Sequence, residues 1–256
     1  MRLLTRRADR ESTAPAAARA CAAGEVEGDR LTPAISRWLR GHRFVADIGA
    51  GTGARATALA AEGHTVVAID VNEGRVAALA TLNESVRPLV ADAKRIPLAS
   101  DSVDGVLCLE TLEHVGDWRS AIAELARITR RAGVLVLSVP TADSERLFRR
   151  LHRRWVEMSG HEDIVSEREL EETLAGRGWA VTSKLRVNGV YTLMWLILAP
   201  LQTPFDDTGT PLRHRALQRL YWGGWRLLFV VRLRSALEAL VDRYLAKSIL
   251  LVCRRM

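Results

Sequence analysis

Apolar residues gather along this chain in short runs that alternate with stretches of helical periodicity. One run, 134–139, is apolar without interruption, which is typical of a central parallel strand covered on both faces. Apolar residues recur at helical spacing through 120–129. Seven apolar segments carry the expected sheet: 44–48, 66–70, 90–93, 105–109, 134–139, 179–187 and 248–252. Strands that alternate with helices predict an α/β fold with a doubly wound, mostly parallel sheet, whose ligands lie at the carboxyl ends of the strands.

A glycine turn follows the first of these segments and is the most specific motif of the chain. The apolar run 44–48 leads into Gly49, Gly51 and Gly53, and an alanine-rich helical stretch, 54–61, begins directly afterwards. Because glycine has no Cβ, its backbone can approach a bulky ligand closely. The free N–H groups of the helix N-terminus attract negative or electron-rich atoms. The turn therefore predicts a nucleotide-like cofactor.

Two classes of cofactor use such a turn. Gly49, Gly51 and Ala54 satisfy the G-x-G-x-x-G/A fingerprint of dinucleotide sites, so the glycines alone leave NAD open. Asp70 ends the second strand, where a carboxylate can accept hydrogen bonds from the two hydroxyls of a ribose. Both classes of cofactor contain such a ribose, so Asp70 does not distinguish between them. Asp47, however, stands where a dinucleotide site usually carries an apolar residue, which points away from NAD.

A third acid, Asp92, ends a short apolar stretch. The segment Leu109–Val115 begins at the last residue of the fourth strand and continues beyond it. In this order the motifs resemble the class I S-adenosylmethionine-dependent methyltransferases, in particular the bacterial type 11 group, and are similar to ubiquinone-biosynthesis-type methyltransferases. The resemblance covers roughly residues 40–187, with a last strand at 248–252. It implies a Rossmann-like methyltransferase fold, S-adenosyl-L-methionine as cofactor and methyl transfer as the activity.

The resemblance also implies which residues bind the cofactor. Asp47 and the turn are expected to hold its amino-acid part and ribose, Asp70 the ribose hydroxyls, and Asp92 with Ala93 the adenine. Asp70 as a strand-end cap and Asp92 as a turn former are the structural alternatives. The full expected set is Asp47, Gly49, Ala50, Gly51, Gly53, Asp70, Val71, Asp92, Ala93, Leu109 and Glu110.

The stretch Glu110-Thr111-Leu112-Glu113-His114 is the sharpest local constellation. On a turn that leads into a helix, Glu110, Glu113 and His114 are expected to converge on one side. Two carboxylates and an imidazole can bind a divalent cation. The ubiquinone-biosynthesis and small-RNA methyltransferases that this stretch resembles include members that use it with a metal. We favour a site without metal, in which His114 is a general base or orients the acceptor.

The expected catalytic residues are therefore His114, Glu113 and His161. His161 resembles a histidine that often precedes the S-x-x-E-L helix in this family, here at 166–170, and points at the acceptor pocket. A histidine exposed on the surface is the alternative for His161.

The chain divides into four parts. Residues 1–30 are basic at first and then alanine-rich, so we expect a loosely ordered segment. Residues 31–187 form the cofactor-binding domain, and 248–256 supply the last strand of its sheet. Between them, 188–247 form an apolar and basic helical insert, which is several times longer than an ordinary connection.

The insert has two apolar runs, 190–201 and 220–231, each too short to span a bilayer, which needs about 20 residues. Tryptophan and arginine beside apolar helices suit the lipid–water interface. A cap over the sheet and an interface in a homodimer are equal alternatives. The basic amphipathic stretch 144–155 is expected as a surface helix or as a lid over the acceptor.

The net charge of +7 is unevenly distributed, because the segment from residue 184 onward holds twelve Lys and Arg against four Asp and Glu. These basic residues interleave with aliphatic runs, and no RNA-binding module accompanies them, so an anionic membrane surface is favoured over nucleic acid. The three cysteines, Cys21, Cys108 and Cys253, lack the C-x-x-C spacing of zinc sites and are too sparse for a disulfide framework. We expect a cytoplasmic protein, peripheral on the inner face of the membrane.

The leading function is methyl transfer to a small or amphiphilic acceptor, such as a lipid, polyprenyl, glycolipid or lipophilic secondary metabolite. The alternatives are an RNA 2′-O-methyltransferase and a non-catalytic cofactor-binding protein. The presence of Asp47, Asp70 and Asp92 counts against the second alternative. An NAD-dependent reductase fits poorly, because the chain has no Tyr-x-x-x-Lys pair.

Overall fold

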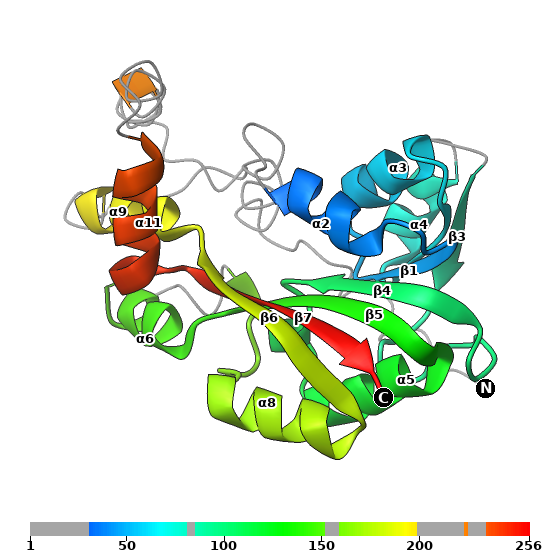
Figure 1. Cartoon of the computed structure of the whole chain (residues 1–256). Coiled ribbons are helices and arrows are strands. Elements are labelled where there is room, and N and C mark those ends of the chain that lie inside the picture. Colours follow the sequence, from blue (N-terminus) through cyan, green and yellow to red (C-terminus); the bar gives the residue numbers. More distant parts are fainter. Residues whose placement is uncertain (1–30, 81–84, 152–158, 199–222, 225–233) are drawn as a thin grey trace, which may run out of the picture.

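The computed structural model describes residues 31–80, 85–151, 159–198, 223–224 and 234–256 (Figure 1). The described strands are β1 (Phe44–Ile48), β2 (Thr65–Asp70), β3 (Val86–Val90), β4 (Val103–Leu109), β5 (Thr129–Pro140), β6 (Trp179–Val187) and β7 (Ser248–Arg255). The described helices are α2 (Leu31–Leu39), α3 (Ala54–Ala61), α4 (Glu73–Leu79), the 3₁₀ turn η1 (Leu112–His114), α5 (Trp118–Ile128), α6 (Ala142–Leu151), α8 (Glu167–Gly176), α9 (Gly189–Leu198) and α11 (Arg234–Leu245). The segment 1–30 and most of the apolar run 220–231 lie outside the described residues.

The strands form one seven-stranded sheet in the order β3-β2-β1-β4-β5-β7-β6. Neighbours from β3 to β5 pair in parallel, whereas β7 pairs antiparallel with both β5 and β6. The strand order reverses between β1 and β4, and the carboxyl ends of the strands at such a point are where ligands usually bind in doubly wound sheets. The expected doubly wound, mostly parallel seven-stranded sheet is confirmed.

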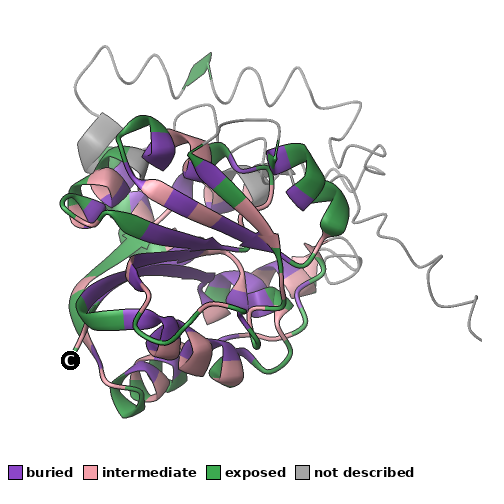
Figure 2. Cartoon of the chain, turned by 90° about the vertical axis from the view of Figure 1, so that its right-hand side faces the viewer, coloured by how far each residue is buried: buried purple, intermediate pink, exposed green. Residues whose placement is uncertain are grey.

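Helices cover both faces of this sheet (Figure 1). Helices α2, α3 and α4 pack on one face, and α5 and α8 on the other. Adjacent residues of β5 serve opposite faces: Val136 joins the cluster with Leu59 of α3, and Leu137 joins the cluster with Leu125 of α5. Figure 2 shows the buried residues concentrated along the central strands. The uninterrupted apolar pattern of β5 thus reflects its burial on both faces.

The helix before β5 ends earlier than the sequence pattern predicts. Basic residues and Gly133 suggest that the helix before β5 closes at 130–133, but α5 ends at Ile128 and Thr129 already pairs with Val103 of β4. The Thr129 hydroxyl donates to the Leu125 carbonyl at 2.6 Å, which satisfies a carbonyl at the helix end. Because that cap needs no glycine, the strand begins earlier than the composition indicates.

The described part of the insert packs as a helix pair. Gly189 at the start of α9 lies against the backbone of α11, where an added Cβ would be 2.7 Å from the Val241 carbonyl oxygen. The Gly189 N–H donates to the Asp242 carboxylate at 2.7 Å. None of the helices that the structure describes has both the length and the apolar character needed to cross a membrane. The division of the chain at residues 187 and 247 stays a prediction.

Candidate functional site

The glycine turn lies between the end of β1 and the start of α3. Gly49, Gly51 and Gly53 have φ angles of 73°, 55° and 75°, a region that residues with a Cβ rarely adopt. At Gly49 an added Cβ would also lie 2.6 Å from Cγ2 of Thr111. At Gly51 the nearest atom to such a Cβ would be the Gly49 carbonyl oxygen, 3.9 Å away. The turn therefore packs tightly against Thr111 on one side and leaves room for a ligand at Gly51.

Asp70 fixes the backbone of this turn. One of its carboxylate oxygens accepts the Gly51 N–H at 2.9 Å, and the other accepts the Asn72 N–H at 2.9 Å. Arg75 approaches the first oxygen to 3.7 Å. Asp70 and Asp47 are both buried at the carboxyl ends of their strands. Since a carboxylate oxygen has two lone pairs, Asp70 can hold the turn and still accept ribose hydroxyls.

The remaining expected cofactor residues lie around the same edge. Asp92 stands just beyond β3, exposed, with its carboxylate accepting the Lys94 N–H at 2.9 Å. Ala93 is partly buried against the core, whereas Val71 is largely exposed. Leu109 ends β4 beside the turn. Their assignment to the cofactor stays a prediction.

Glu110 adopts a φ angle of 48°, unusual for a residue with a side chain, and its carboxylate turns toward the end of the insert. One oxygen accepts from Ser138 at 2.8 Å, and the other from Ser248 at 3.0 Å and Lys247 at 3.2 Å. Burial alone would raise the pKa of Glu110, but the Lys247 ammonium and these hydrogen bonds outweigh burial and lower the pKa below its usual value. The carboxylate is therefore ionised and already engaged.

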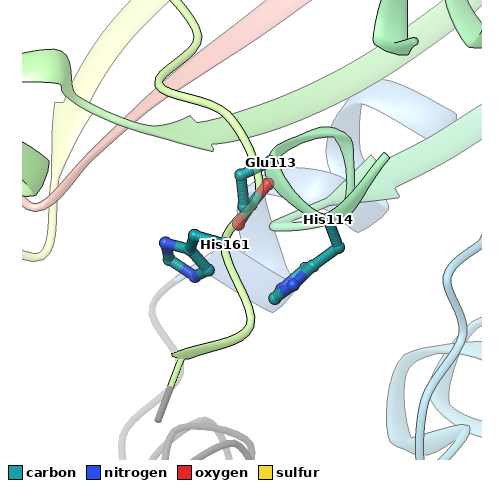
Figure 3. A group of neighbouring side chains, drawn as sticks. All are labelled: Glu113, His114 and His161. Carbon is teal, nitrogen blue, oxygen red and sulfur yellow. The ribbon is translucent and has the colours of Figure 1, made fainter. Parts of the chain in front are cut away.

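Three side chains from two separate segments meet close to the end of β4 (Figure 3). Glu113 and His114 belong to η1, and His161 belongs to the segment before α8. Ligand atoms of the three residues lie within 4.8 Å of one another, and the imidazole rings meet edge to face with centroids 4.8 Å apart. This Glu113–His114–His161 cluster unites the three catalytic candidates. The sequence predicts that Glu110 lies together with Glu113 and His114. In the structure His161 takes that place.

Hydrogen bonds fix the orientation of both imidazoles. Nδ1 of His114 lies 3.1 Å from the Gly160 carbonyl oxygen, which can only accept, so that nitrogen carries the proton. Nδ1 of His161 lies 2.8 Å from the Glu145 carboxylate, to which it donates in the same way. In each neutral ring, Nε2 is then the nitrogen that can accept a proton or bind a metal.

The carboxyl group of Glu113 is 1% exposed. Burial and the nearby charge of Glu110 raise its pKa well above the usual value. Among the described residues, its Oε2 has no hydrogen-bond partner. Desolvation and the neighbouring His161 lower the pKa of His114. Burial thus favours the uncharged forms of both the Glu113 carboxyl group and the His114 imidazole.

The cluster also fits a divalent cation. Two imidazole nitrogens and one carboxylate oxygen form a donor set that Zn²⁺, Mn²⁺ and Fe²⁺ accept. The buried Oε2 of Glu113 would gain a partner, and the bonds from His114 and His161 to Gly160 and Glu145 are of the kind that orient metal-binding imidazoles. The residues for a metal would thus be Glu113, His114 and His161.

Sequence reasoning missed several residues that shape this site. Thr111 joins β1 to β4, because its hydroxyl lies within hydrogen-bonding distance of the Ile48 and Leu109 carbonyls. Glu145 is buried although it lies in a strongly charged helix. Lys247 reaches Glu110 from the far end of the insert. Only Thr111 carried a local signal, since it stands inside the E-x-x-E-H stretch.

Comparisons with known proteins agree with this geometry. A family model described as a methyltransferase domain matches residues 46–137. A demethylmenaquinone methyltransferase of Mycolicibacterium paratuberculosis is 30% identical over 156 residues, which are 53% of this chain and 67% of that protein. A probable S-adenosylmethionine-dependent methyltransferase of Mycobacterium tuberculosis is 29% identical over 131 residues, which are 45% of this chain and 48% of that protein. The chain therefore spans about half the length of several curated relatives that it matches.

Solved structures share the fold. The cyclase SpnF superposes with a TM-score of 0.60 at 21% identity, covering 89% of this chain and 80% of that chain. A geranyl diphosphate methyltransferase, in complex with GPP and sinefungin, superposes with a TM-score of 0.60 at 13% identity, covering 88% and 78%. Fold alone does not fix the reaction, since one of these structures is named as a cyclase. The family model and the mycobacterial relatives are more specific, and on them this chain belongs to the class I S-adenosylmethionine-dependent methyltransferases.

Proposed function

We propose that this chain transfers the methyl group of S-adenosylmethionine to a small or amphiphilic acceptor bound beside the Glu113–His114–His161 cluster. The observation that carries the proposal is the adjacency of two sites. The glycine turn follows β1, and the cluster begins at Glu113, four residues after the end of the neighbouring strand β4. Thr111, packed against Gly49, connects the two. A donor on the turn and an acceptor at the cluster would meet at the carboxyl ends of these two strands.

The residues around the turn fit the cofactor. The space beside Gly51, the buried carboxylates of Asp47 and Asp70 and the N-terminus of α3 can hold its polar parts. When bound, S-adenosylmethionine supplies a methyl carbon activated by its sulfonium, and transfer leaves the electron pair of the broken carbon–sulfur bond on sulfur.

The protein has two tasks in such a transfer. It must hold the acceptor in line with the methyl group, which lowers the barrier through orientation. It must also take the proton of a hydroxyl acceptor as the new bond to carbon forms. A neutral imidazole of His114 or His161 can accept that proton at Nε2 and become an imidazolium.

The proposed acceptor class rests on the apolar character of the insert and on a relative of the chain. Helix α9 is almost entirely apolar and packs on α11, whose end is tied to Glu110. Demethylmenaquinone, the acceptor named for the mycobacterial relatives, is an amphiphilic molecule that matches such surroundings. A quinol-type hydroxyl or ring carbon is therefore our first choice of acceptor.

An anionic membrane surface is part of the proposal. Leu237, Leu240 and Tyr244 are exposed on α11 at helical spacing, with Arg243 beside them. An apolar stripe flanked by a basic side chain can lie in the headgroup layer of a membrane. Trp222 and Trp225, the tryptophans of the apolar run 220–231, lie outside the described residues.

Use of a divalent cation is a second candidate, which the donor set of the cluster favours. Such an ion, held by Glu113, His114 and His161, would stabilise negative charge on the acceptor oxygen. If it takes part, a chelator should abolish turnover and a divalent cation should restore it. Full activity in chelator would exclude it.

Cofactor binding tests the proposal first. S-adenosylmethionine should raise the melting temperature by mass action, and NADH should not. Asp70→Ala should weaken binding by roughly 1–3 kcal/mol, because both the ribose hydroxyls and the turn lose their acceptor. Asp143→Ala, at an exposed position of α6, is the matched control and should bind as the wild type does. Equal stabilisation by NADH, or unchanged affinity in Asp70→Ala, would contradict the cofactor assignment.

A further inference from the structure

Helix α6 buries a carboxylate that its sequence does not predict to be inside. The helix reads Ala-Asp-Ser-Glu-Arg-Leu-Phe-Arg-Arg-Leu, yet Glu145 is 2% exposed and thus as buried as Phe148 of the same helix. Burial of a carboxylate is costly unless charged or hydrogen-bonding groups compensate it. A glutamate at this position therefore calls for specific partners.

Those partners are His161 and Arg149. The Glu145 carboxylate lies 2.8 Å from Nδ1 of His161, and its other oxygen lies 3.5 Å from Nε of Arg149. Arg149 also donates to the backbone carbonyl of His161 at 3.3 Å. Two residues one helix turn apart in α6 thus contact His161, Glu145 at its ring and Arg149 at its backbone carbonyl.

We propose that Glu145 is a positioning residue, which holds His161 in the tautomer protonated at Nδ1 and so presents Nε2 to the acceptor site. The proposal rests on the function given above, in that His161 faces the acceptor. It adds a residue outside the glycine turn and the E-x-x-E-H stretch to the machinery of the reaction.

The partner of each imidazole distinguishes the two histidines. His114 donates to the neutral carbonyl of Gly160, whereas His161 donates to a carboxylate. A hydrogen bond to a charged acceptor is roughly twice as strong as one between neutral groups. A carboxylate also stabilises the imidazolium that forms when Nε2 takes a proton, as in the triads of other enzymes. Of the two rings, His161 is therefore the one arranged for proton transfer, and His114 the one arranged to orient.

Glu145 is itself held in place by the end of the insert. Thr141, which precedes α6, donates its N–H to the Lys247 carbonyl at 2.8 Å and its hydroxyl to the Ala246 carbonyl at 2.9 Å. The Ser144 hydroxyl lies 2.7 Å from the same Lys247 carbonyl. These bonds tie the first turn of α6 to the junction of α11 and β7. The carboxylate is thus fixed from both sides before any acceptor binds.

The tautomer of His161 can be measured directly. The full-length protein, labelled with ¹⁵N-histidine, is studied by ¹⁵N NMR at neutral pH, and the His161 signals are identified from their absence in His161→Asn. We expect a protonated Nδ1 and an unprotonated Nε2 in the wild type. Glu145→Leu, which keeps the size but removes the acceptor, should lose this form. Glu172→Leu, at an exposed position of α8, is the matched control and should keep it.

A wild-type His161 protonated at Nε2, or an unchanged tautomer in folded Glu145→Leu, would overturn the proposal. If Glu145→Leu does not fold, the wild-type spectrum decides alone. In turnover with a reduced naphthoquinol as probe acceptor, Glu145→Leu should lower kcat roughly 10²-fold and leave KM for S-adenosylmethionine unchanged. If the wild type shows the expected tautomer but methylates nothing, the proposed function fails and the positioning of His161 by Glu145 stands.

Discussion

The Lys247 ammonium lies 3.2 Å from the Glu110 carboxylate, although 137 residues separate the two in sequence. Glu110 directly follows β4, and Lys247 joins the insert to β7. Both side chains are largely buried, with 13% of the Lys247 surface and 20% of the Glu110 surface exposed. The pair therefore connects the far end of the insert to the carboxyl end of β4.

Removing the lysine should destabilise the protein measurably. Lys247→Met keeps most of the aliphatic stem but leaves the Glu110 carboxylate without its counter-charge, which should cost roughly 1–3 kcal/mol in the free energy of unfolding. Urea unfolding followed by circular dichroism measures this. Lys184→Met, which breaks more exposed pairs with Glu167 and Glu171, should cost less than about 1 kcal/mol. Equal losses in both variants would show that the buried pair has no special weight.

Gly49 should not tolerate a side chain. Its φ angle of 73° disfavours any Cβ, and that Cβ would collide with Thr111. We expect Gly49→Ala to lower stability by roughly 2–4 kcal/mol, from strain and overpacking together, and to weaken S-adenosylmethionine binding. Gly176→Ala, where an added Cβ meets nothing within 4 Å, should be neutral or slightly stabilising. Adding Thr111→Ala to Gly49→Ala should recover part of the stability, and no recovery would argue against the collision.

Glu124 should contribute stability that depends on pH. Its carboxylate binds the Arg127 guanidinium and the Ile96 N–H, which hold its pKa below the usual value. A depressed pKa stabilises the fold above the pKa of the unfolded state, about 4.3 for glutamate, and this stability is lost as the pH falls through the folded pKa. Glu124→Gln should therefore be less stable than the wild type at pH 7, and the difference should shrink below about pH 4.3. A difference that stays constant from pH 7 to pH 3 in urea unfolding would contradict this.

The exposed stripe on α11 should bind lipid. Wild-type protein should pellet with vesicles of phosphatidylglycerol and phosphatidylethanolamine at low salt, and salt should release only part of it, because apolar contacts resist screening. Leu240→Ser with Tyr244→Ser should release most of the remainder. Val181→Ser, at an exposed apolar position of β6, is the control and should bind normally. Wild-type protein that stays in the supernatant while it still binds S-adenosylmethionine would assign these helices to a cap or a subunit interface.

Local signals in the sequence predict the parts of the fold that local chemistry determines. The alanine-rich helix at 54–61 and the strand at 179–187 have the bounds that the pattern predicts. The glycine turn is equally local, because its positive φ angles and the contact of Gly49 with Thr111 disfavour any residue with a Cβ at these positions. Such features follow from periodicity and from the geometry of a few adjacent residues.

Contacts between distant segments are what the sequence does not reveal. Glu145 lies in a helix that reads as a charged surface, and only its pairing with His161 explains its burial. Glu110 appears from its spacing to belong with Glu113 and His114, but Lys247 and Ser248 engage its carboxylate from the other end of the fold. Both outcomes depend on how the sheet brings the ends of β4 and β7 together.

The central claim, methyl transfer to an amphiphilic acceptor, is tested most directly with S-adenosylmethionine that carries an isotopically labelled methyl group. The protein is incubated with this cofactor and a total cell extract, which is then divided into organic-soluble, nucleic-acid and protein fractions for mass spectrometry. We predict label in an organic-soluble compound, and at least roughly 10²-fold less of it with His161→Asn. Label confined to RNA, or no label from protein that binds S-adenosylmethionine through Asp70, would contradict this account.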